Sequence, residues 1–219
     1  IKTLKAIEES NVVIMLLDGQ QEVADQDVTL LGHVIESGRA LVIAVNKWDG
    51  LETDQRDTIK SQLDRQLNFI DYAKIFFVSA LHGSGVGLLL EAAEKAYESA
   101  MSDLATPDLT RVLEAALEQH QPPLVRGRRI KLKYAHQGGV NPPIIVIHGN
   151  QIGDVPGSYE RYLSNVFRKA FKLHGTPVRI EFRTSDNPYH GRKNKLSPRQ
   201  QKKRQRMMKH ISKAKKKKS

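Results

Sequence analysis

The chain has 219 residues and carries a formal net charge of +11. It contains no cysteine, so disulfides and thiolate metal sites are excluded. No stretch approaches the about 20 apolar residues that a membrane-spanning helix needs. The first residues show no signal-peptide pattern, so we expect a cytoplasmic protein without membrane contact. None of the eight histidines has a second ligand at metal-binding spacing, and no metal site is predicted.

The charge is divided sharply along the chain. Residues 1–119 contain 10 Lys and Arg and 20 Asp and Glu, whereas residues 120–219 contain 25 and 4, so the net charges are −10 and +21. Halves of opposite sign predict two functional units, of which the basic one faces a polyanion. Residues 190–219 hold 14 Lys and Arg and no acid. Such a segment cannot bury a core, so we expect a disordered tail that binds RNA or, alternatively, only aids solubility.

The acidic half alternates continuous apolar runs with amphipathic segments. Buried strands are predicted at 12–17, 41–45 and 75–78, and helices over 25–37, 53–67 and 86–101. Continuous apolar strands separated by helices are typical of a parallel sheet that is covered on both faces. The predicted fold class is therefore α/β, with part of a doubly wound nucleotide-binding domain in this half.

The basic half has a different rhythm, because its strands alternate polar and apolar residues. Helices are predicted over 109–120 and 159–173, and strands at 128–134, 144–147 and 178–182, the first two joined as a hairpin. The order helix, strand, strand, helix, strand predicts a small α+β layer of three strands and two helices.

The run Asn46-Lys47-Trp48-Asp49 follows the predicted strand 41–45 directly. The carboxyl ends of strands are where α/β sheets bind ligands. The Asp49 carboxylate can accept hydrogen bonds from the N1–H and the exocyclic amine of guanine, a pair of donors that adenine lacks. The Asn46 amide can donate to N7, and the Lys47 stem can lie along the base. The alternative is a polar turn, with Asp49 and the following glycine supplying turn chemistry.

A second loop strengthens the guanine interpretation. The strand predicted at 75–78 ends in Ser79-Ala80, where guanine-nucleotide folds place a backbone N–H for the guanine O6 and a small residue beside the base. The candidate guanine-binding residues are therefore Asn46, Lys47, Asp49, Ser79 and Ala80.

Longer runs carry a specific resemblance. The stretches from Val45 to Gly50, Ser79 to Gly87, Gln121 to Arg129 and Tyr134 to Asn150 resemble the bacterial tandem GTPases known as Der or EngA. That family has two successive GTPase domains and a carboxyl-terminal KH-like domain, and it acts in assembly of the large ribosomal subunit. The resemblance implies a partial P-loop-type GTPase domain, namely the latter part of the second one, over residues 1–103. It implies a KH-like domain over 104–188 and a basic tail over 189–219.

The same resemblance implies ligands and partners. The ligand would be GTP or GDP, with Mg²⁺ in the intact protein. The partners would be the large ribosomal subunit with its rRNA, and the upstream first GTPase domain of the same protein.

One half of such a nucleotide site has no counterpart in this sequence. The family's phosphate-binding G-x-x-x-x-G-K-[ST] loop and its magnesium-binding Asp-x-x-Gly find no match. The run from Gly83 to Gly87 lacks the Lys-Ser/Thr and reads better as a turn before a helix. We therefore expect a partial chain, without catalytic residues, that does not hydrolyse GTP alone. The alternative is an RNA-binding module with a non-catalytic GTPase remnant.

The basic half offers candidate RNA contacts. KH domains use a G-x-x-G loop between two helices to approach the RNA backbone, and no such loop occurs where this domain would need it. Electrostatic contacts with the RNA backbone are therefore expected. For the arginines on the strand, an equally good interpretation is that their charges protect an exposed sheet edge from pairing with another strand. The candidates are Arg126, Arg128 and Arg129 on the strand, and Lys202, Lys203, Arg204 and Arg206 in the tail.

Overall fold

The computed structural model describes residues 2–67, 70–125 and 127–184, and residues 1–185 form one compact unit. The predicted tail over 189–219 lies outside the described residues. No helix within the described ranges is long and apolar enough to cross a membrane.

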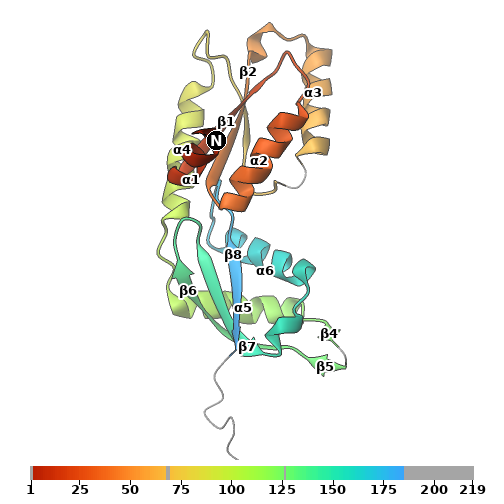
Figure 1. Ribbon diagram of the computed structural model, residues 1–219, viewed down its shortest axis with the longest axis vertical. Coiled ribbons are helices and arrows are strands. Elements are labelled where there is room, and N and C mark those ends of the chain that lie inside the picture. Colours follow the sequence, from red (N-terminus) through yellow and green to blue (C-terminus); the bar gives the residue numbers. More distant parts are fainter. Residues whose placement is uncertain (1, 68–69, 126, 185–219) are drawn as a thin grey trace, which may run out of the picture. The chain divides into compact units, whose positions relative to one another are not determined.

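A three-stranded parallel sheet forms the core of the first part of the chain (Figure 1). Its strands are β1 (Val12–Asp18), β2 (Ala40–Asn46) and β3 (Ile75–Phe77), in the order β1-β2-β3. Every residue of the central strand β2 except Asn46 is buried. That pattern is expected of a strand with helices on both faces, and it confirms the α/β prediction.

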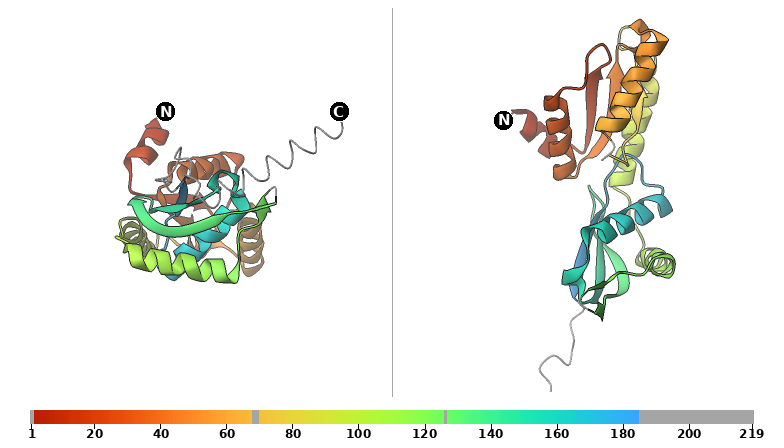
Figure 2. Two further views of the ribbon diagram at one scale, coloured as in Figure 1. Left: turned by 90° about the horizontal axis from the view of Figure 1, so that it is seen from below. Right: turned by 90° about the vertical axis from the view of Figure 1, so that its right-hand side faces the viewer.

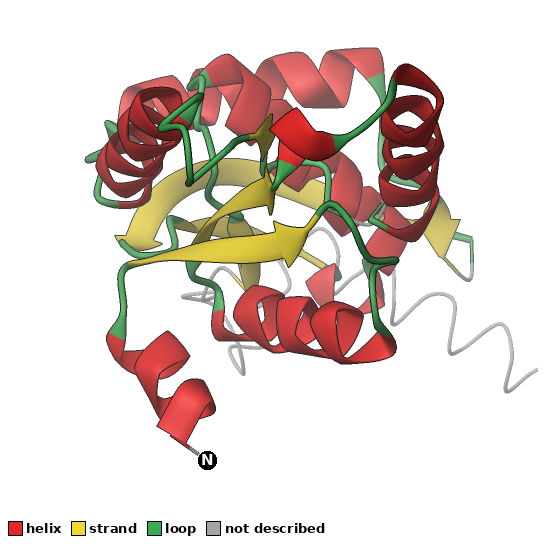
Figure 3. Cartoon of the chain, turned by 90° about the horizontal axis from the view of Figure 1, so that it is seen from above, coloured by secondary structure: helices red, strands yellow, loops and turns green. Residues whose placement is uncertain are grey.

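Helices cover both faces of this sheet, as Figure 3 shows. The helices α2 (Asp25–Ser37) and α3 (Thr53–Gln66) pack on one face, together with the short α1 (Lys2–Glu9), which was not predicted. The helix α4 (Val86–Ala100) packs on the other face, where small side chains such as Ala96 allow close approach. The predicted positions of α2, α3 and α4 are confirmed to within one residue at each end.

The second part of the chain is built around a mixed sheet of β6 (Lys131–Gly139), β7 (Ile144–Asn150) and β8 (Arg179–Thr184). The strands β6 and β7 form the predicted antiparallel hairpin, and β8 adds parallel to β7. The helices α5 (Thr106–Gln119) and α6 (Gly157–Ala170) lie on one face and bury one continuous apolar core against it (Figure 2). The predicted α+β layer is confirmed.

One predicted strand was wrong in its extent. Residues 128–134 do not form a single strand, because a separate hairpin pairs β4 (Leu124–Val125) with β5 (Arg128–Arg129). The turn between them includes Gly127 at φ 72°, a left-handed conformation that glycine adopts without strain. The buried Ile130 then separates this hairpin from β6. The break was not predicted because basic and apolar residues alternate without interruption from β5 into β6.

Within the compact unit, a loop after α6 is hydrogen bonded to the first sheet. The Leu41 N–H donates to the Gly175 carbonyl at 2.6 Å, and the Gly175 N–H donates to the Tyr72 carbonyl at 3.1 Å. Gly175 is at φ 65°, and a Cβ there would lie 2.6 Å from that of Ala96. Only glycine fits this close approach.

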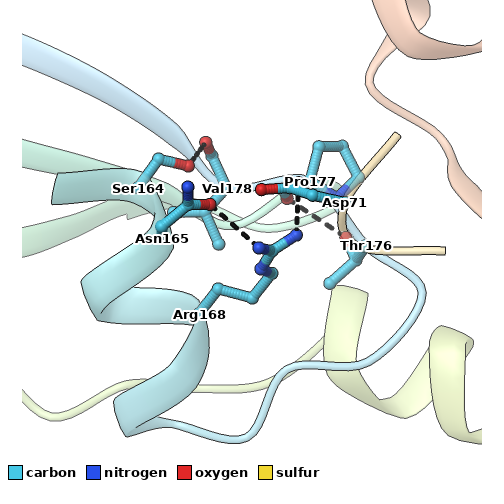
Figure 4. A network of polar contacts seen from close by, with 7 residues as sticks. All are labelled: Asp71, Ser164, Asn165, Arg168, Thr176, Pro177 and Val178. Carbon is cyan, nitrogen blue, oxygen red and sulfur yellow. Dashed lines mark hydrogen bonds and ion pairs between the residues drawn. The ribbon is translucent and has the colours of Figure 1, made fainter. Parts of the chain in front are cut away.

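A largely buried cation reinforces the same junction. The Arg168 guanidinium, with 11% of its side chain exposed, donates to the Asp71 carboxylate at 2.7 Å and to the Asn165 side-chain oxygen at 2.9 Å (Figure 4). Nearby, the Ser164 hydroxyl donates to the Val178 carbonyl at 2.8 Å.

Candidate functional site

The candidate site begins where β1 and β2 end. Asp18 and Asn46 are the last residues of these strands and are paired in register. The Gly19 N–H donates to the Asn46 carbonyl at 2.9 Å, and a Cβ at Gly19 would lie 2.8 Å from that oxygen. Glycine therefore allows the loop after β1 to lie directly against the loop after β2.

The Asn46 side chain joins the two predicted loops. Its Oδ1 accepts the Ala80 N–H at 2.9 Å, which brings the end of β2 against the loop after β3. A backbone N–H of the Ser79-Ala80 loop is predicted to donate to the guanine O6. If it is the Ala80 N–H, a bound base would share it with Asn46 or replace the Asn46 oxygen. The Asn46 amide nitrogen has no such role and can serve an acceptor on a ligand.

Lys47 lies across the mouth of the site. Its backbone is left-handed, at φ 62°, and its Nζ forms an ion pair with the Asp18 carboxylate at 2.7 Å. The hydrogen bond from Lys47 lowers the pKa of Asp18 below its usual range. The next residue, Trp48, turns inward onto Phe77, with ring centroids 4.1 Å apart. This packing anchors the loop, and it leaves the Lys47 stem along one wall of the site.

Asp49 presents the carboxylate of the site. It lies in the one-turn 3-10 helix Trp48–Gly50, with 37% of its side chain exposed. A hydrogen bond from the buried Ser79 side chain lowers the pKa of Asp49, and the nearby His82 and Arg56 lower it further. The carboxylate is therefore ionised at neutral pH, and its Oδ2 lies 3.2 Å from His82 Nε2.

These groups surround a pocket of about 310 Å³. All but Ala80 of the five predicted guanine-binding residues line it. Ala80 is exposed beside it, and the additional lining residues are Gln20, Gly50 and Leu81. The pocket combines an ionised carboxylate, an amide and an ammonium group with a backbone N–H nearby, which together can recognise the polar edge of a planar heterocycle.

Two contributors to the site were missed from the sequence. Asp18 holds Lys47, and His82 holds Asp49. The position of Asp18 at the end of an apolar run was a usable signal, because parallel strands end at the same edge of a sheet. His82 follows Ser79 by three residues, and its backbone N–H donates to the Ser79 hydroxyl at 3.3 Å.

The predicted RNA contacts are only partly visible. Arg129 is exposed on β5, and the backbone of Arg128 belongs to the same strand. Arg126 and the tail residues Lys202, Lys203, Arg204 and Arg206 lie outside the described residues. Among the residues that the structure describes, no three His, Cys, Asp or Glu side chains lie close enough to hold a metal ion.

Comparison with protein families defines the class of this chain. Residues 2–99 match a model described as the elongation factor Tu GTP-binding domain. Residues 104–183 match a model described as the KH-domain-like region of EngA bacterial GTPase enzymes, C-terminal. The chain thus combines GTP-binding-domain sequence with a KH-like domain.

Several curated GTPases are similar to the chain over almost all of its length. GTPase Der of Teredinibacter turnerae is 60% identical over 98% of this chain and 46% of its own length. GTPase Der of Hahella chejuensis is 56% identical over 98% and 46%, and that of Salmonella newport is 56% identical over 98% and 44%. The chain is therefore a homologue of the Der (EngA) GTPases, as the sequence resemblance predicted. It spans about half the length of these relatives.

A solved structure also aligns with the chain. Era, crystallised in complex with MgGDPNP and nucleotides 1506–1542 of 16S ribosomal RNA, is 16% identical, and the alignment covers 83% of this chain and 67% of Era with a TM-score of 0.35.

Proposed function

We propose that this pocket binds the guanine base of GTP or GDP, as part of a cytoplasmic GTPase that acts in assembly of the large ribosomal subunit. One observation carries the proposal. The ionised Asp49 and the amide of Asn46 line the same pocket, and the Ala80 N–H is tied to Asn46 at 2.9 Å. Homology to the Der GTPases supports it.

The chemistry of the pocket favours guanine over adenine. The Asp49 carboxylate accepts from N1–H and from the exocyclic amine, and the amide of Asn46 donates to N7. Adenine offers no pair of donors at these positions, so it would leave Asp49 without partners. The contact with His82 at 3.2 Å occupies Asp49 when no base is bound, and binding would exchange this partner for the base.

The nucleoside alone tests the base pocket, because it needs no phosphate-binding loop. Guanosine added to the whole chain should move the backbone amide NMR signals of Ser79, Ala80 and Asp49, and adenosine should not. Asp49→Asn should abolish the guanosine response and favour xanthosine, which carries an oxygen in place of the exocyclic amine. Asp57→Asn, on the exposed surface of α3, is the matched control and should respond like the unmodified chain. Equal responses to guanosine and adenosine would contradict the proposal.

The phosphates of the nucleotide and its Mg²⁺ are assigned to none of the described residues. GTP hydrolysis depends on groups that position the phosphates and stabilise charge in the transition state. We propose that those groups lie in a part of the protein beyond this chain, and that the family's first GTPase domain is a partner. An RNA-binding module with a non-catalytic GTPase remnant is the alternative, and the guanosine experiment separates the two.

We further propose that the basic half faces the rRNA of the large subunit. Residues 120–219 carry 25 Lys and Arg against 4 Asp and Glu, a charge suited to phosphates. Each phosphate contact by a cation adds roughly 0.7–0.9 to the slope of log affinity against log salt concentration. The chain ending at Tyr189 should therefore show a salt slope flatter by several units than the whole chain in filter binding to large-subunit rRNA. Equal slopes would show that the tail does not contact RNA.

A further inference from the structure

The mixed sheet of the second part has one face that its helices do not cover. Residues of the three strands alternate between the two faces. Ala135, Ile147 and Ile180 point into the core beneath α5 and α6. Their neighbours Tyr134, His136, His148, Glu181 and Arg183 are on the opposite face. Figure 2 shows both helices on the same side of this sheet.

Three rings form a cluster on this second face. Tyr134 is paired with His148 across β6 and β7, and their rings are nearly parallel, at 5°, with centroids 4.5 Å apart. The His136 ring lies 5.1 Å from that of His148 at an angle of 27°. A β-bulge between Leu132 and Tyr134 sets the register that brings Tyr134 opposite His148. The rings thus stand side by side with similar orientation, although they come from two strands.

The outermost ring is open to solvent. Tyr134 is 42% exposed, and it is the one exposed large apolar side chain among the described residues of these three strands. A buried apolar cluster does not explain this position, and a protein interface would be expected to expose a larger contiguous apolar patch. The first part of the chain shows that contrast: Leu16 of β1 and Leu88 of α4 are 56% and 60% exposed.

Cations flank the rings. Arg183 of β8 is paired with His148 in register, so Tyr134, His148 and Arg183 form one row across the three strands. Lys133 directly precedes Tyr134 at the bulge. The three strands together contain four Lys and Arg and one carboxylate, Glu181, which pairs with Arg183 at 2.9 Å. The Arg183 side chain is 59% exposed and that of Glu181 is 46% exposed, so water and a phosphate can compete with Glu181 for Arg183.

We propose that this face binds single-stranded RNA, with an unpaired base stacked on Tyr134 and the adjoining phosphate beside Arg183. Aromatic rings on an open sheet face are a recurrent means of binding unpaired bases, and every base has a flat face to stack. The imidazole edge of His136 adds hydrogen-bonding groups beside the stacked base. The inference rests on the proposed RNA-facing role of the basic half. It adds a defined contact surface to that role, separate from the tail and from Arg129.

The test compares two tyrosines that are almost equally exposed. Tyr134 and Tyr97, on α4, are 42% and 44% exposed. The whole chain is titrated into a short single-stranded RNA that contains 2-aminopurine, over a series of salt concentrations. Tyr134→Ala should weaken binding roughly 5- to 150-fold, the range for loss of one base–aromatic stack, with an unchanged salt slope. Tyr134→Trp should retain the affinity and quench the 2-aminopurine, and Tyr97→Ala should bind like the unmodified chain.

Arg183→Gln supplies the complementary signature. It should flatten the salt slope by about 0.7, the value for one phosphate contact on a single strand, and leave the quenching by Tyr134→Trp in place. Circular dichroism of each variant establishes that it is folded. RNA binding that is equal for Tyr134→Ala and the unmodified chain overturns the stacking surface while leaving the RNA-facing role intact. Failure of the unmodified chain to bind RNA overturns both.

Discussion

The two sheets of this chain expose their chemistry in different places. In the parallel sheet β1–β3 helices pack on both faces, and the candidate pocket lies at the edge where the strands end. In the mixed sheet β6–β8 helices cover one face, and the other face carries Tyr134, His148 and Arg183. The number of sheet faces that helices cover therefore favours a small pocket for a single ligand in the first part. In the second part it leaves a broad sheet face on which a larger ligand can bind.

The two parts also differ in what they leave exposed. The first carries a net charge of −10 over residues 1–119, and its exposed apolar side chains include Ile14 and Leu16 on β1 and Leu88 and Leu90 on α4. Among the described residues, β1 pairs with β2 alone. An open strand edge beside apolar surface is typical of a surface that can pair with or bind another segment or protein.

The largest expected effect tests whether the two parts unfold separately. Phe167 of α6 is completely buried, and Phe167→Ala should lower the free energy of unfolding by about 3–5 kcal/mol. Because Leu41 and Tyr72 are hydrogen bonded to Gly175, we expect both parts to lose stability together. Urea unfolding would be followed by circular dichroism and by the fluorescence of Trp48, the single tryptophan, which lies in the first part.

The control is Leu90→Ala, a residue 59% exposed on α4, which should change stability by less than about 0.5 kcal/mol. A Trp48 transition that stays at its original urea midpoint in Phe167→Ala, while the circular dichroism transition moves, would mean that the parts are independent.

The next effect concerns the ion pair at the junction. Burial raises the pKa of Asp71, but the hydrogen bond and charge of Arg168 outweigh it and leave the pKa below its ordinary value of 3.8. Arg168→Met should cost about 1–2 kcal/mol, less than a buried pair, because Asp71 is 49% exposed. Because folding lowers the pKa of Asp71, the ion pair stabilises the folded state at pH values above 3.8. This stabilisation is lost as the pH falls below that value and Asp71 becomes protonated.

Asp71→Asn supplies the matched arm of a double-mutant cycle. In the cycle the two substitutions should not be additive, and the coupling should weaken as the pH falls below 3.8, the ordinary pKa of the Asp71 carboxyl. Additive losses at pH 7 would show that Arg168 acts through packing alone.

The sequence predicted most elements because their periodicities were clear. The apolar run of β2, with six of its seven residues buried, and the glycine after α2 left few alternatives. The break between β5 and β6 was missed, because alternation of polar and apolar residues says nothing about which strand a residue pairs with. Helix α1 was missed because its eight residues give too short a periodic signal.

The candidate site was predictable in its residue types and less so in its internal contacts. The positions of Asn46 and Asp49 followed from strand ends, which parallel sheets bring together. The pairing of Lys47 with Asp18, and of Asp49 with His82, depends on side-chain direction across loops. The ring cluster on β6 and β7 depends on a bulge that shifts the register at Tyr134, which local composition does not reveal.

A smaller effect probes the helix layer of the second part. The Tyr159 hydroxyl donates to the His120 carbonyl at 2.6 Å, and burial, aided by Tyr162, raises the pKa of Tyr159 to about 12. Tyr159→Phe should cost about 0.5–1.5 kcal/mol near neutral pH. Because the folded pKa is the higher one, this contribution is complete below pH 10 and is lost as the pH rises toward 12.

Thermal unfolding at pH 7 and at pH 11 measures that difference. The gap between the unmodified chain and Tyr159→Phe should narrow at the higher pH. A gap that stays constant would mean that the hydroxyl contributes nothing through its proton. Tyr97→Phe, at an exposed position on α4, is the control and should show no gap at either pH.

The smallest effect returns to the pocket and tests how far the first part relies on fixed polar groups. The Ser79 side chain is the main cause of the lowered pKa of Asp49. Ser79→Ala removes that hydrogen bond, so the pKa of Asp49 should rise toward its ordinary value of 3.8.

A carboxyl carbon NMR titration between pH 2 and pH 6 measures the shift directly. Because the rise still leaves Asp49 ionised at neutral pH, guanosine binding there should change little, whereas at pH 4 it should weaken more in Ser79→Ala than in the unmodified chain. An unchanged titration of Asp49 would show that its own backbone hydrogen bond and the charges of His82 and Arg56, and not the Ser79 hydroxyl, lower the pKa of this carboxyl.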